Sequence, residues 1–413
     1  MNIYLLIILV SMIGAYLLEN ASIYLNVRHL DPVVPREFID VVDREKYRRS
    51  QEYTRKQSKV HLFHSSVNLA ILLAFILGGG FAWLDGLVRS FSLPPVWSGL
   101  IFFACLGFAL DLFSLPFEIY NTFVLEEKFG FNRMTPKLFL TDKLKGYLLT
   151  LAIGGPLLAG ILLFLSSYPD WGWLFAWSLI VLVMLLVHCL APTLILPLFN
   201  TFTPLEEGDL KRKIEAYAWR NGFDLSGIFV MDGSKRSSKS NAFFTGLGRK
   251  KRIALFDTLV EKHEPDELVA VLAHEIGHYK KKHILKNMIL AIVKTGILLF
   301  LVSLFISHPP LFAAFGLNQP SVYAGLVFFA LLYTPIALIL SLYLNFLSRK
   351  FEYQADAFAA KTTTRPENLI QALKRLSADN LSNLTPHPFY VFLNYSHPPV
   401  LNRIKALKQA ENA

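Results

Sequence analysis

Long apolar runs alternate with shorter polar stretches along most of the chain. Seven of these runs are each about long enough to cross the hydrocarbon core of a bilayer as a helix. They lie at Ile3–Leu18, Leu62–Leu84, Trp97–Phe117, Tyr147–Ser166, Trp173–Leu198, Met288–Ser307 and Val322–Phe346. The first run has no basic segment before it and no small-residue cleavage site after it, so we expect an uncleaved span. The pattern predicts a mainly α-helical, polytopic membrane protein with seven transmembrane helices.

Basic residues occupy alternate connections between the runs. Segments 20–60 and 118–146 carry many lysines and arginines, whereas 85–96 carries only Arg89, and 167–172 and 308–321 carry neither residue type. Because positively charged loops stay on the cytoplasmic side, the alternation places the N-terminus outside and the C-terminus in the cytoplasm. We therefore expect the basic loops and the soluble segments to lie together on the cytoplasmic face.

The pattern changes to that of a soluble domain after the fifth run. Leu205–Asn221 has the spacing of an amphipathic helix, and Gly227–Met231 is typical of a short strand. Residues 241–246 and Arg252–Phe256 form two further candidate strands, joined by a glycine-containing turn at 246–251. The prediction is a small β-sheet that leads directly into the next helix.

Composition supports a bilayer protein and narrows its chemistry. Of the 413 residues, 53% are hydrophobic and 34 are Phe, and the mean hydropathy of +0.41 exceeds that of ordinary soluble proteins. The net charge of +10 comes from separate blocks in the loops, which favours topology signals over a nucleic-acid surface. Cys105 and Cys189 both lie in apolar runs, which excludes a disulfide framework and a CxxC metal pair. Any metal must use histidine and carboxylate ligands.

One motif with metal-binding chemistry follows the candidate strands. His274 and His278 belong to an HExxH sequence, and residues four apart share one face of a helix. Pro265 and nearby acidic residues mark the start of that helix. Neutral imidazoles are good zinc ligands, and Glu275 is placed to take a proton from the attacking water. The motif predicts a zinc hydrolase with one zinc ion.

Two histidines leave a catalytic zinc one protein ligand short. The extended pattern HExxHxxGxxH fails, because Lys281 replaces its glycine and Ile284 its third histidine, with His283 one place away. Glu352 and Asp356 offer another solution, since they lie one helical turn apart after the last apolar run. Glu352 would ligate the metal while Asp356 orients a ligand histidine. The alternative is a solvated acidic face of the helix.

Other polar residues have two interpretations. Ser396-His397-Pro398 and Arg403 form either part of the site or a turn followed by an ordinary helical arginine. Asp111, Glu118 and His188 lie in or beside apolar runs, where they are costly unless they face a water-filled cavity or pair with one another.

With these motifs the chain resembles the type I CAAX prenyl endopeptidases, which are integral-membrane zinc metalloproteases of the gluzincin group with seven transmembrane helices. The resemblance covers nearly the whole chain. Beyond HExxH and ExxxD, it rests on Tyr47, Ser50, Gln51 and Tyr53, on 126–132 with Thr135, on 191–200, on 240–246 and on Ser396-His397-Pro398.

The resemblance implies a role for each candidate residue. The zinc ligands would be His274, His278 and Glu352, and Glu275 would be the general base. Asp356 would orient a ligand and handle protons, and His397 with Arg403 would stabilise the oxyanion or steady the site. The substrate backbone would be held by Asn241, Ala242 and Phe243. The family also encloses its site in a partly water-filled chamber formed by the helices.

The expected domain organisation follows from these segments. The first five spans fill residues 1–199, and the protease domain is split into 200–286 and 347–413 by a membrane hairpin at 287–346. The resemblance implies a prenylated C-terminal CAAX peptide as substrate. An unprenylated substrate in membrane-protein quality control is the alternative, because the short chain without a KDEL-like tail favours a bacterial inner membrane over the endoplasmic reticulum. A transporter with a structural zinc is the rival class, and the sequence does not constrain the oligomeric state.

Overall fold

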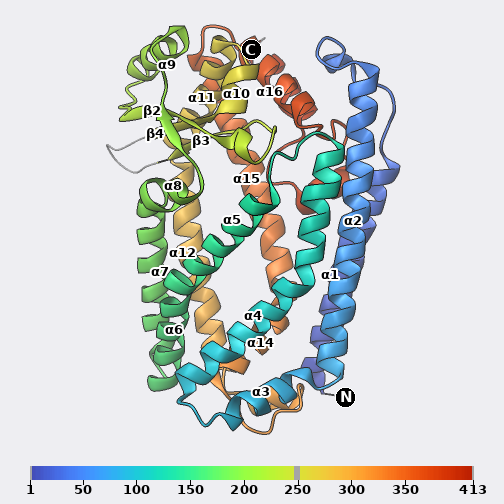
Figure 1. Cartoon of the computed structure of the whole chain (residues 1–413), viewed down its shortest axis with the longest axis vertical. Helices are drawn as coiled ribbons and strands as arrows, with labels where there is room; N and C mark the ends of the chain where they lie inside the picture. Colours follow the sequence, from blue (N-terminus) through green and yellow to red (C-terminus); the bar gives the residue numbers. More distant parts are fainter. Residues whose placement is uncertain (1, 246–251, 412–413) are drawn as a thin grey trace.

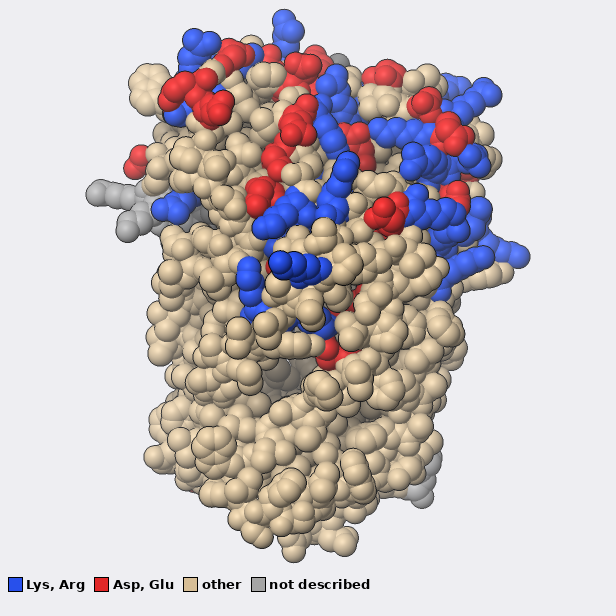
Figure 2. All heavy atoms as spheres, viewed as in Figure 1, with Lys and Arg blue, Asp and Glu red and all other residues tan. Residues whose placement is uncertain are grey.

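The computed structural model describes residues 2–245 and 252–411. Figure 1 shows long helices in the lower part of the molecule and a small sheet with shorter helices in the upper part. The N-terminus lies at the lower end and the C-terminus at the upper end. On the face drawn in Figure 2, charged side chains gather over the upper part, while the lower part is almost entirely uncharged. This division matches a helical bundle in a bilayer that carries a water-exposed domain.

Among the described residues, six helical stretches are long and apolar enough to span a membrane. Three of them contain a π-helical segment, at Asn121–Glu126, Thr150–Gly154 and Ala191–Ile195. The stretches are α1 (Ile3–Arg28), α2 (Arg44–Leu77), α4 (Pro95–Tyr120) with the first π segment, α5 (Pro136–Leu149) and α6 (Gly155–Ser167), α7 (Gly172–Leu190) and α8 (Leu196–Phe199), and α12 (His283–Phe305). The predicted polytopic, mainly helical fold is confirmed.

The last apolar run is not one straight helix. It forms α14 (Val322–Leu332) and α15 (Thr334–Thr362), which meet at a bend of 58°. Pro335 stands in the first turn of α15 and has no N–H to continue the hydrogen bonds of α14, which explains the break. The predicted seventh span at Val322–Phe346 is therefore a bent pair of helices, and the span count reaches seven if this pair crosses the membrane as one unit.

The predicted second run also ends early. α2 stops at Leu77, Gly79 takes a φ of 73°, and the chain turns into α3 (Gly80–Ser90). Glycine tolerates this left-handed conformation, so the Gly-rich link breaks the run that we expected to reach Leu84. Residues of α3 and the short α13 (Pro309–Ala313) share a buried cluster with α4 and α14, at the end of the bundle far from the sheet.

The sheet has four strands in the order β1-β2-β4-β3. They are β1 (Phe202–Pro204), β2 (Gly227–Met231), β3 (Ala242–Thr245) and β4 (Arg252–Phe256). β2 and β4 are parallel, with Gly227 opposite Arg252, whereas β3 runs antiparallel to β4, with Ala242 opposite Leu255. The predicted pair of strands is confirmed, and the turn predicted between them lies outside the described residues. β3 is an edge strand of the described sheet.

The predicted amphipathic helix begins later than expected. α9 spans Asp209–Arg220, and Leu205 instead continues the edge of the sheet, where its N–H donates to the carbonyl of Ile228 at 2.9 Å.

The soluble part also contains a short 3₁₀ turn in the first loop and a second one after β2. The remaining elements are the turns Arg36–Phe38 and Gly233–Lys235 and the helices α10 (Asp257–Lys262), α11 (Pro265–Lys280), α16 (Glu367–Asp379), α17 (Pro388–Asn394) and α18 (Val400–Glu411).

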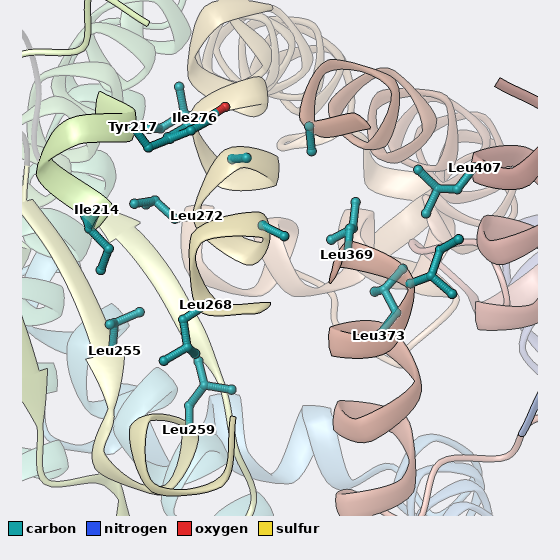
Figure 3. Packing of buried hydrophobic residues seen from close by; sticks show 14 of the residues in the cluster. Ile214, Tyr217, Leu255, Leu259, Leu268, Leu272, Ile276, Leu369, Leu373 and Leu407 are labelled. Carbon is teal, nitrogen blue, oxygen red and sulfur yellow. The ribbon is translucent and has the colours of Figure 1, made fainter. Parts of the chain in front are cut away.

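One hydrophobic core joins segments from both sides of the membrane hairpin. Figure 3 shows Ile214 and Tyr217 of α9 and Leu255 of β4 on one side of α11, with α16 and α18 on the other. Leu268, Leu272 and Ile276 recur along α11 at helical spacing and are almost completely buried. The core therefore fixes the HExxH helix against both the sheet and the C-terminal helices.

α11 also approaches α15 very closely. At Gly277, inside the HExxH motif, a Cβ atom would lie 3.1 Å from the Cα and the carbonyl oxygen of Ala355 and 3.2 Å from Phe358. Because two of these atoms are backbone, a side chain at this position cannot be accommodated without moving one helix. Glycine therefore allows α15 to bring Glu352 and Asp356 up to the motif.

We expect Gly277→Leu to destabilise the protein by about 1–3 kcal/mol or more, because the new side chain forces α11 and α15 apart. The measurement is the unfolding temperature of the purified protein in detergent. Gly146→Leu is the matched control, because a Cβ at Gly146 of α5 meets no atom within 4 Å. Equal unfolding temperatures for the two variants would contradict this account of the helix contact.

Candidate metal centre

Three of the sequence-predicted site residues come together in one cluster. His274 and His278 project from α11, and Glu352 reaches them from α15. Their potential ligand atoms all lie within 4.8 Å of one another. Glu352 is 4% exposed and His274 is 7% exposed, so the cluster is almost sealed on the side of the protein core. The alternative of a solvated acidic face at Glu352 is thereby excluded.

The distances within the cluster fit one tetrahedral metal ion. His274 Nε2 lies 3.1 Å from His278 Nε2 and 3.4 Å from Glu352 Oε2, and His278 Nε2 lies 3.2 Å from Glu352 Oε1. Two atoms bound to zinc at about 2.0–2.1 Å with tetrahedral geometry lie about 3.3 Å apart. Glu352 Oε2 is buried and has no hydrogen-bond partner among the described residues. A cation placed between these atoms would satisfy it.

The electrostatic environment also favours a cation. Burial lowers the pKa of His274, but the neighbouring carboxylates of Asp356 and Glu352 outweigh burial and raise the pKa to about 9. The two carboxylates that stabilise a protonated imidazole would equally stabilise a metal ion bound to the neutral ring. Two imidazoles and one carboxylate are also a ligand set that zinc uses in hydrolytic enzymes.

Asp356 and Arg403 lie directly behind His274. The outer Nδ1 of His274 is 2.8 Å from Asp356 Oδ1, and Arg403 donates to the two oxygens of Asp356 from Nε at 2.8 Å and from Nη2 at 2.6 Å. Burial disfavours the charged form of Arg403, yet the charge of Asp356 and their hydrogen bonds raise its pKa. The pair is thus ionised and fixes the ring of His274 with Nε2 toward the cluster.

A further histidine, His283, which the ligand spacing did not select, stands next to His278. Nδ1 of His283 lies 3.1 Å from Nδ1 of His278, and its Nε2 lies 2.9 Å from Gln354 Oε1. His283 is outside the ligand set because it meets the outer nitrogen of His278. The sequence showed this residue one place away from the position of a third ligand, but spacing along the helix could not show which atom it contacts.

His397 lies beside the cluster, and Glu275 directly follows His274 on α11. Glu275 is half-buried and adds to the negative charge around Arg403. His397 Nε2 lies 3.4 Å from Glu352 Oε1, its Nδ1 lies 3.0 Å from the hydroxyl of Ser396, and its side chain is 63% exposed. The structure therefore places His397 beside the cluster and Arg403 behind it, although the sequence grouped the two residues.

The predicted substrate-binding segment lies at the edge of the sheet. Asn241 is exposed, its side-chain oxygen accepts from the N–H of Ala242 at 2.8 Å, and its carbonyl accepts from Phe256. Ala242 and Phe243 are the first residues of β3, whose partner on one side is β4. The side chain of Phe243 lies outside the described part of the chain. The other edge of β3 carries no strand within the described sheet.

The polar residues of the bundle are partly paired. Lys143 donates to Asp111 at 2.8 Å and to Glu118 at 2.7 Å, and Tyr147 donates to Asp111 at 2.6 Å. Asp111 and Glu118 therefore share one lysine between α4 and α5, which offsets one of their two negative charges, while His188 on α7 is exposed. Figure 2 shows the surface of the lower part hollowed, with acidic atoms at the edge of the hollow.

A multi-pass helical bundle with an HExxH helix and a buried glutamate beside it defines an integral-membrane metallopeptidase. Family models agree with this class. Residues 23–201 match the description "CAAX prenyl protease N-terminal, five membrane helices", and residues 204–411 match "Peptidase family M48". The chain belongs to the M48 family of CAAX prenyl proteases and is a metalloendopeptidase. This assignment gives no support to the rival class of transporter.

Individual relatives cover nearly the whole chain. "CAAX prenyl protease 1 homolog" of Oryza sativa subsp. japonica is 36% identical over 99% of this chain and 98% of its own length. "CAAX prenyl protease 1" of Saccharomyces cerevisiae is 38% identical over 91% of this chain and 88% of its own. A solved structure, "Crystal Structure of S. mikatae Ste24p", covers 98% of this chain and 99% of its own, with a TM-score of 0.93 at 36% identity.

We expect Arg403→Met to lower the stability of the metal-free protein by roughly 3–5 kcal/mol, because the buried carboxylate of Asp356 would lose its guanidinium partner and keep only its contact with His274. Denaturant unfolding of metal-stripped protein in detergent measures the change. Lys128→Met is the control, since the Lys128–Glu52 ion pair is solvent-exposed and is worth at most about 1 kcal/mol. A loss of less than 1 kcal/mol for Arg403→Met would show that the pair is not sealed from water.

Proposed function

We propose that the chain is a zinc endopeptidase that hydrolyses a peptide bond near the C-terminus of a membrane-associated substrate. The observation that carries the proposal is the convergence of His274, His278 and Glu352 on one point, with Glu275 on the same helix as the two histidines. Zinc held by these three side chains would polarise the scissile carbonyl and make water more acidic. Proton transfer and part of the oxyanion stabilisation would come from side chains of the protein.

Glu275 is the proposed general base. It is half-buried and directly follows His274 on α11, so it belongs to the same helical turn as the first proposed ligand. Its carboxylate takes the proton as the water oxygen forms a bond to the carbonyl carbon. The same carboxyl group then gives this proton to the amine as the C–N bond breaks, so Glu275 ends in its starting state.

His397 is the proposed donor to the developing oxyanion. Ser396 holds its Nδ1, so Nε2 is free to turn from Glu352 toward a substrate on the exposed side. A donor aimed at the position where negative charge develops stabilises the transition state more than the substrate. Arg403, which is committed to Asp356 and 11% exposed, steadies the site instead.

β3 is the proposed binding site for the substrate backbone. No other strand of the described sheet pairs with its outer edge, so an extended peptide can add there as a further strand. Asn241, Ala242 and Phe243 lie at the start of this edge, and β3 contacts α11. A peptide bound along β3 therefore lies beside the helix that carries the metal ligands.

The proposed substrate class is the prenylated CAAX peptide, because the relatives described above are named CAAX prenyl proteases. A lipid-anchored peptide suits an endopeptidase whose catalytic helices continue out of a membrane bundle. Membrane-protein quality control without a prenyl requirement is the second candidate, and it is favoured by the edge strand, which binds backbone irrespective of side chains.

We also propose that the catalytic domain lies on the cytoplasmic side of the membrane. The basic loops 20–60 and 118–146 lie at the same end of the bundle as the sheet, and such loops remain in the cytoplasm. The relatives named above are eukaryotic, so they give no support to a bacterial inner membrane, and the membrane of residence stays a prediction.

We expect Glu275→Gln to keep zinc and to lower kcat on a peptide substrate by roughly 100- to 10,000-fold, because the amide cannot accept the proton. Metal content and turnover are measured on the same detergent-purified sample. Glu261→Gln, at an exposed carboxylate of α10, is the control and should retain full turnover. Normal turnover by Glu275→Gln would refute the assignment of the base.

Two peptides of one CAAX sequence, one farnesylated and one not, separate the two substrate classes. If the prenyl group is recognised, the farnesylated peptide has the higher kcat/KM at equal concentration of detergent. Equal kcat/KM values would favour quality control. A chelator should abolish cleavage of both peptides, and cleavage that survives complete removal of the metal would contradict both candidates.

A further inference from the structure

The ring of His278 has a partner on the side that faces away from the metal cluster. Its Nε2 points to His274 and Glu352, at 3.1 Å and 3.2 Å, so Nδ1 is the outer nitrogen. This Nδ1 lies 3.1 Å from Nδ1 of His283. An imidazole therefore stands behind one ligand histidine in the position that the carboxylate of Asp356 occupies behind the other.

His283 is itself rigidly held. It is 1% exposed, and its ring stacks on Phe351 with a centroid separation of 4.2 Å and an interplanar angle of 10°. Its Nε2 lies 2.9 Å from Gln354 Oε1. Phe351 and Gln354 flank Glu352 on α15, so the residues that fix His283 belong to the same helical turn as the third ligand.

The hydrogen bonds from His278 through His283 to Gln354 can run in only one donor-to-acceptor direction. When the Nε2 of a neutral His278 binds a metal, its one hydrogen is on Nδ1, which donates to His283. Nδ1 of His283 is then an acceptor and carries no hydrogen. The remaining hydrogen of His283 is on Nε2, which donates to Gln354 Oε1, an atom that only accepts. Nδ1 of His278, both ring nitrogens of His283 and Gln354 Oε1 therefore each have a hydrogen-bond partner.

The backbone between α11 and α12 is bent sharply at this place. Lys282 has a φ of 58°, a left-handed conformation that is unfavourable for a residue with a side chain. The turn is closed by Lys281 N–H donating to Gly277 at 2.9 Å and Lys282 N–H donating to Tyr279 at 2.9 Å. It brings the first residue of α12, His283, back against His278, and strain of this kind is often kept where it positions functional groups.

We propose that His283 is a positioning residue for the metal site, which holds the ring of His278 with Nδ1 toward His283 and Nε2 aimed at the metal. The inference rests on the zinc site of the proposed function. The two ligand histidines are then anchored differently: His274 by an ionised Asp356–Arg403 pair, and His278 by a neutral His283–Gln354 relay. Both relays end on side chains carried by or bound to α15.

The test compares zinc dissociation constants of full-length variants in detergent, measured by competition with a chelator. His283→Phe keeps a ring against Phe351 but removes the acceptor, so we expect roughly 10- to 100-fold weaker zinc binding. His283→Asn puts an amide oxygen close to the place of Nδ1 and should recover most of the affinity. The absorption bands of bound Co²⁺ should change in His283→Phe and return toward those of the wild type in His283→Asn.

His308→Phe is the matched control, because His308 follows the other end of α12, roughly 35 Å away, and bonds to Tyr4. Its zinc affinity should be that of the wild type. Gln354→Leu is the second variant in case His283→Phe does not fold, which the unfolding temperature of the metal-free protein shows. It leaves the ring of His283 in place without its acceptor and should also weaken zinc binding.

Each outcome bears on one claim. Wild-type zinc affinity in both His283→Phe and Gln354→Leu would overturn the role of His283, and so would a failure of His283→Asn to recover affinity while His283→Phe remains folded. A wild-type protein that binds no zinc would instead overturn the proposed function.

Discussion

Two carboxylates on one turn of α15 are almost completely buried. Their burial determines which side chains must pack around them. Glu352 is 4% exposed and Asp356 is 2% exposed. An unpaired buried charge costs several kcal/mol, so cationic or hydrogen-donating partners must be packed against both groups. Arg403 of α18 and the outer nitrogen of His274 satisfy Asp356, whereas one oxygen of Glu352 is left without a hydrogen bond among the described residues. A cation between the two histidines and Glu352 would satisfy that oxygen, which supports the metal site that we propose there.

A single helix, α15, connects the membrane bundle to the proposed catalytic site. α15 begins at the bend after α14, runs out of the membrane region and ends in the hydrophobic core of the soluble domain. Glu352 is therefore positioned by helix packing in both environments, and the close contact at Gly277 sets its approach to α11. A substrate anchored in the bilayer needs only a short extended segment to reach β3 and the cluster, which suits the substrates that we propose.

Sequence alone predicted the elements whose signals are local. Apolar length predicted the spans, and the i, i+4 spacing of HExxH and ExxxD predicted the faces that meet in the cluster, because side chains one turn apart must share a face. The bend at Tyr333 and the early end of α2 were missed, although Pro335 and Gly78-Gly79 stood at those places as possible signals. Hydrophobicity persists through both breaks, so a pattern based on apolar length cannot detect them.

The partners behind the ligands could not be predicted from the sequence. Arg403 and His283 lie on α18 and α12, and their contacts depend on how those helices pack against α11 and α15. A lone arginine or histidine in a sequence gives no sign of the atom that it will meet. The family resemblance implied a role for Arg403 in the site. The role of His283 rests on the short distance between its Nδ1 and that of His278.

The coordination of zinc in the purified protein tests the central claim most directly. X-ray absorption at the zinc edge should show one zinc with nitrogen and oxygen neighbours at about 2.0–2.1 Å, including the outer-shell scattering of two imidazoles. Glu352→Ala should reduce the number of protein ligands by one while both imidazoles remain. A sulfur neighbour at about 2.3 Å, or a spectrum that is unchanged in Glu352→Ala, would contradict the site described for His274, His278 and Glu352.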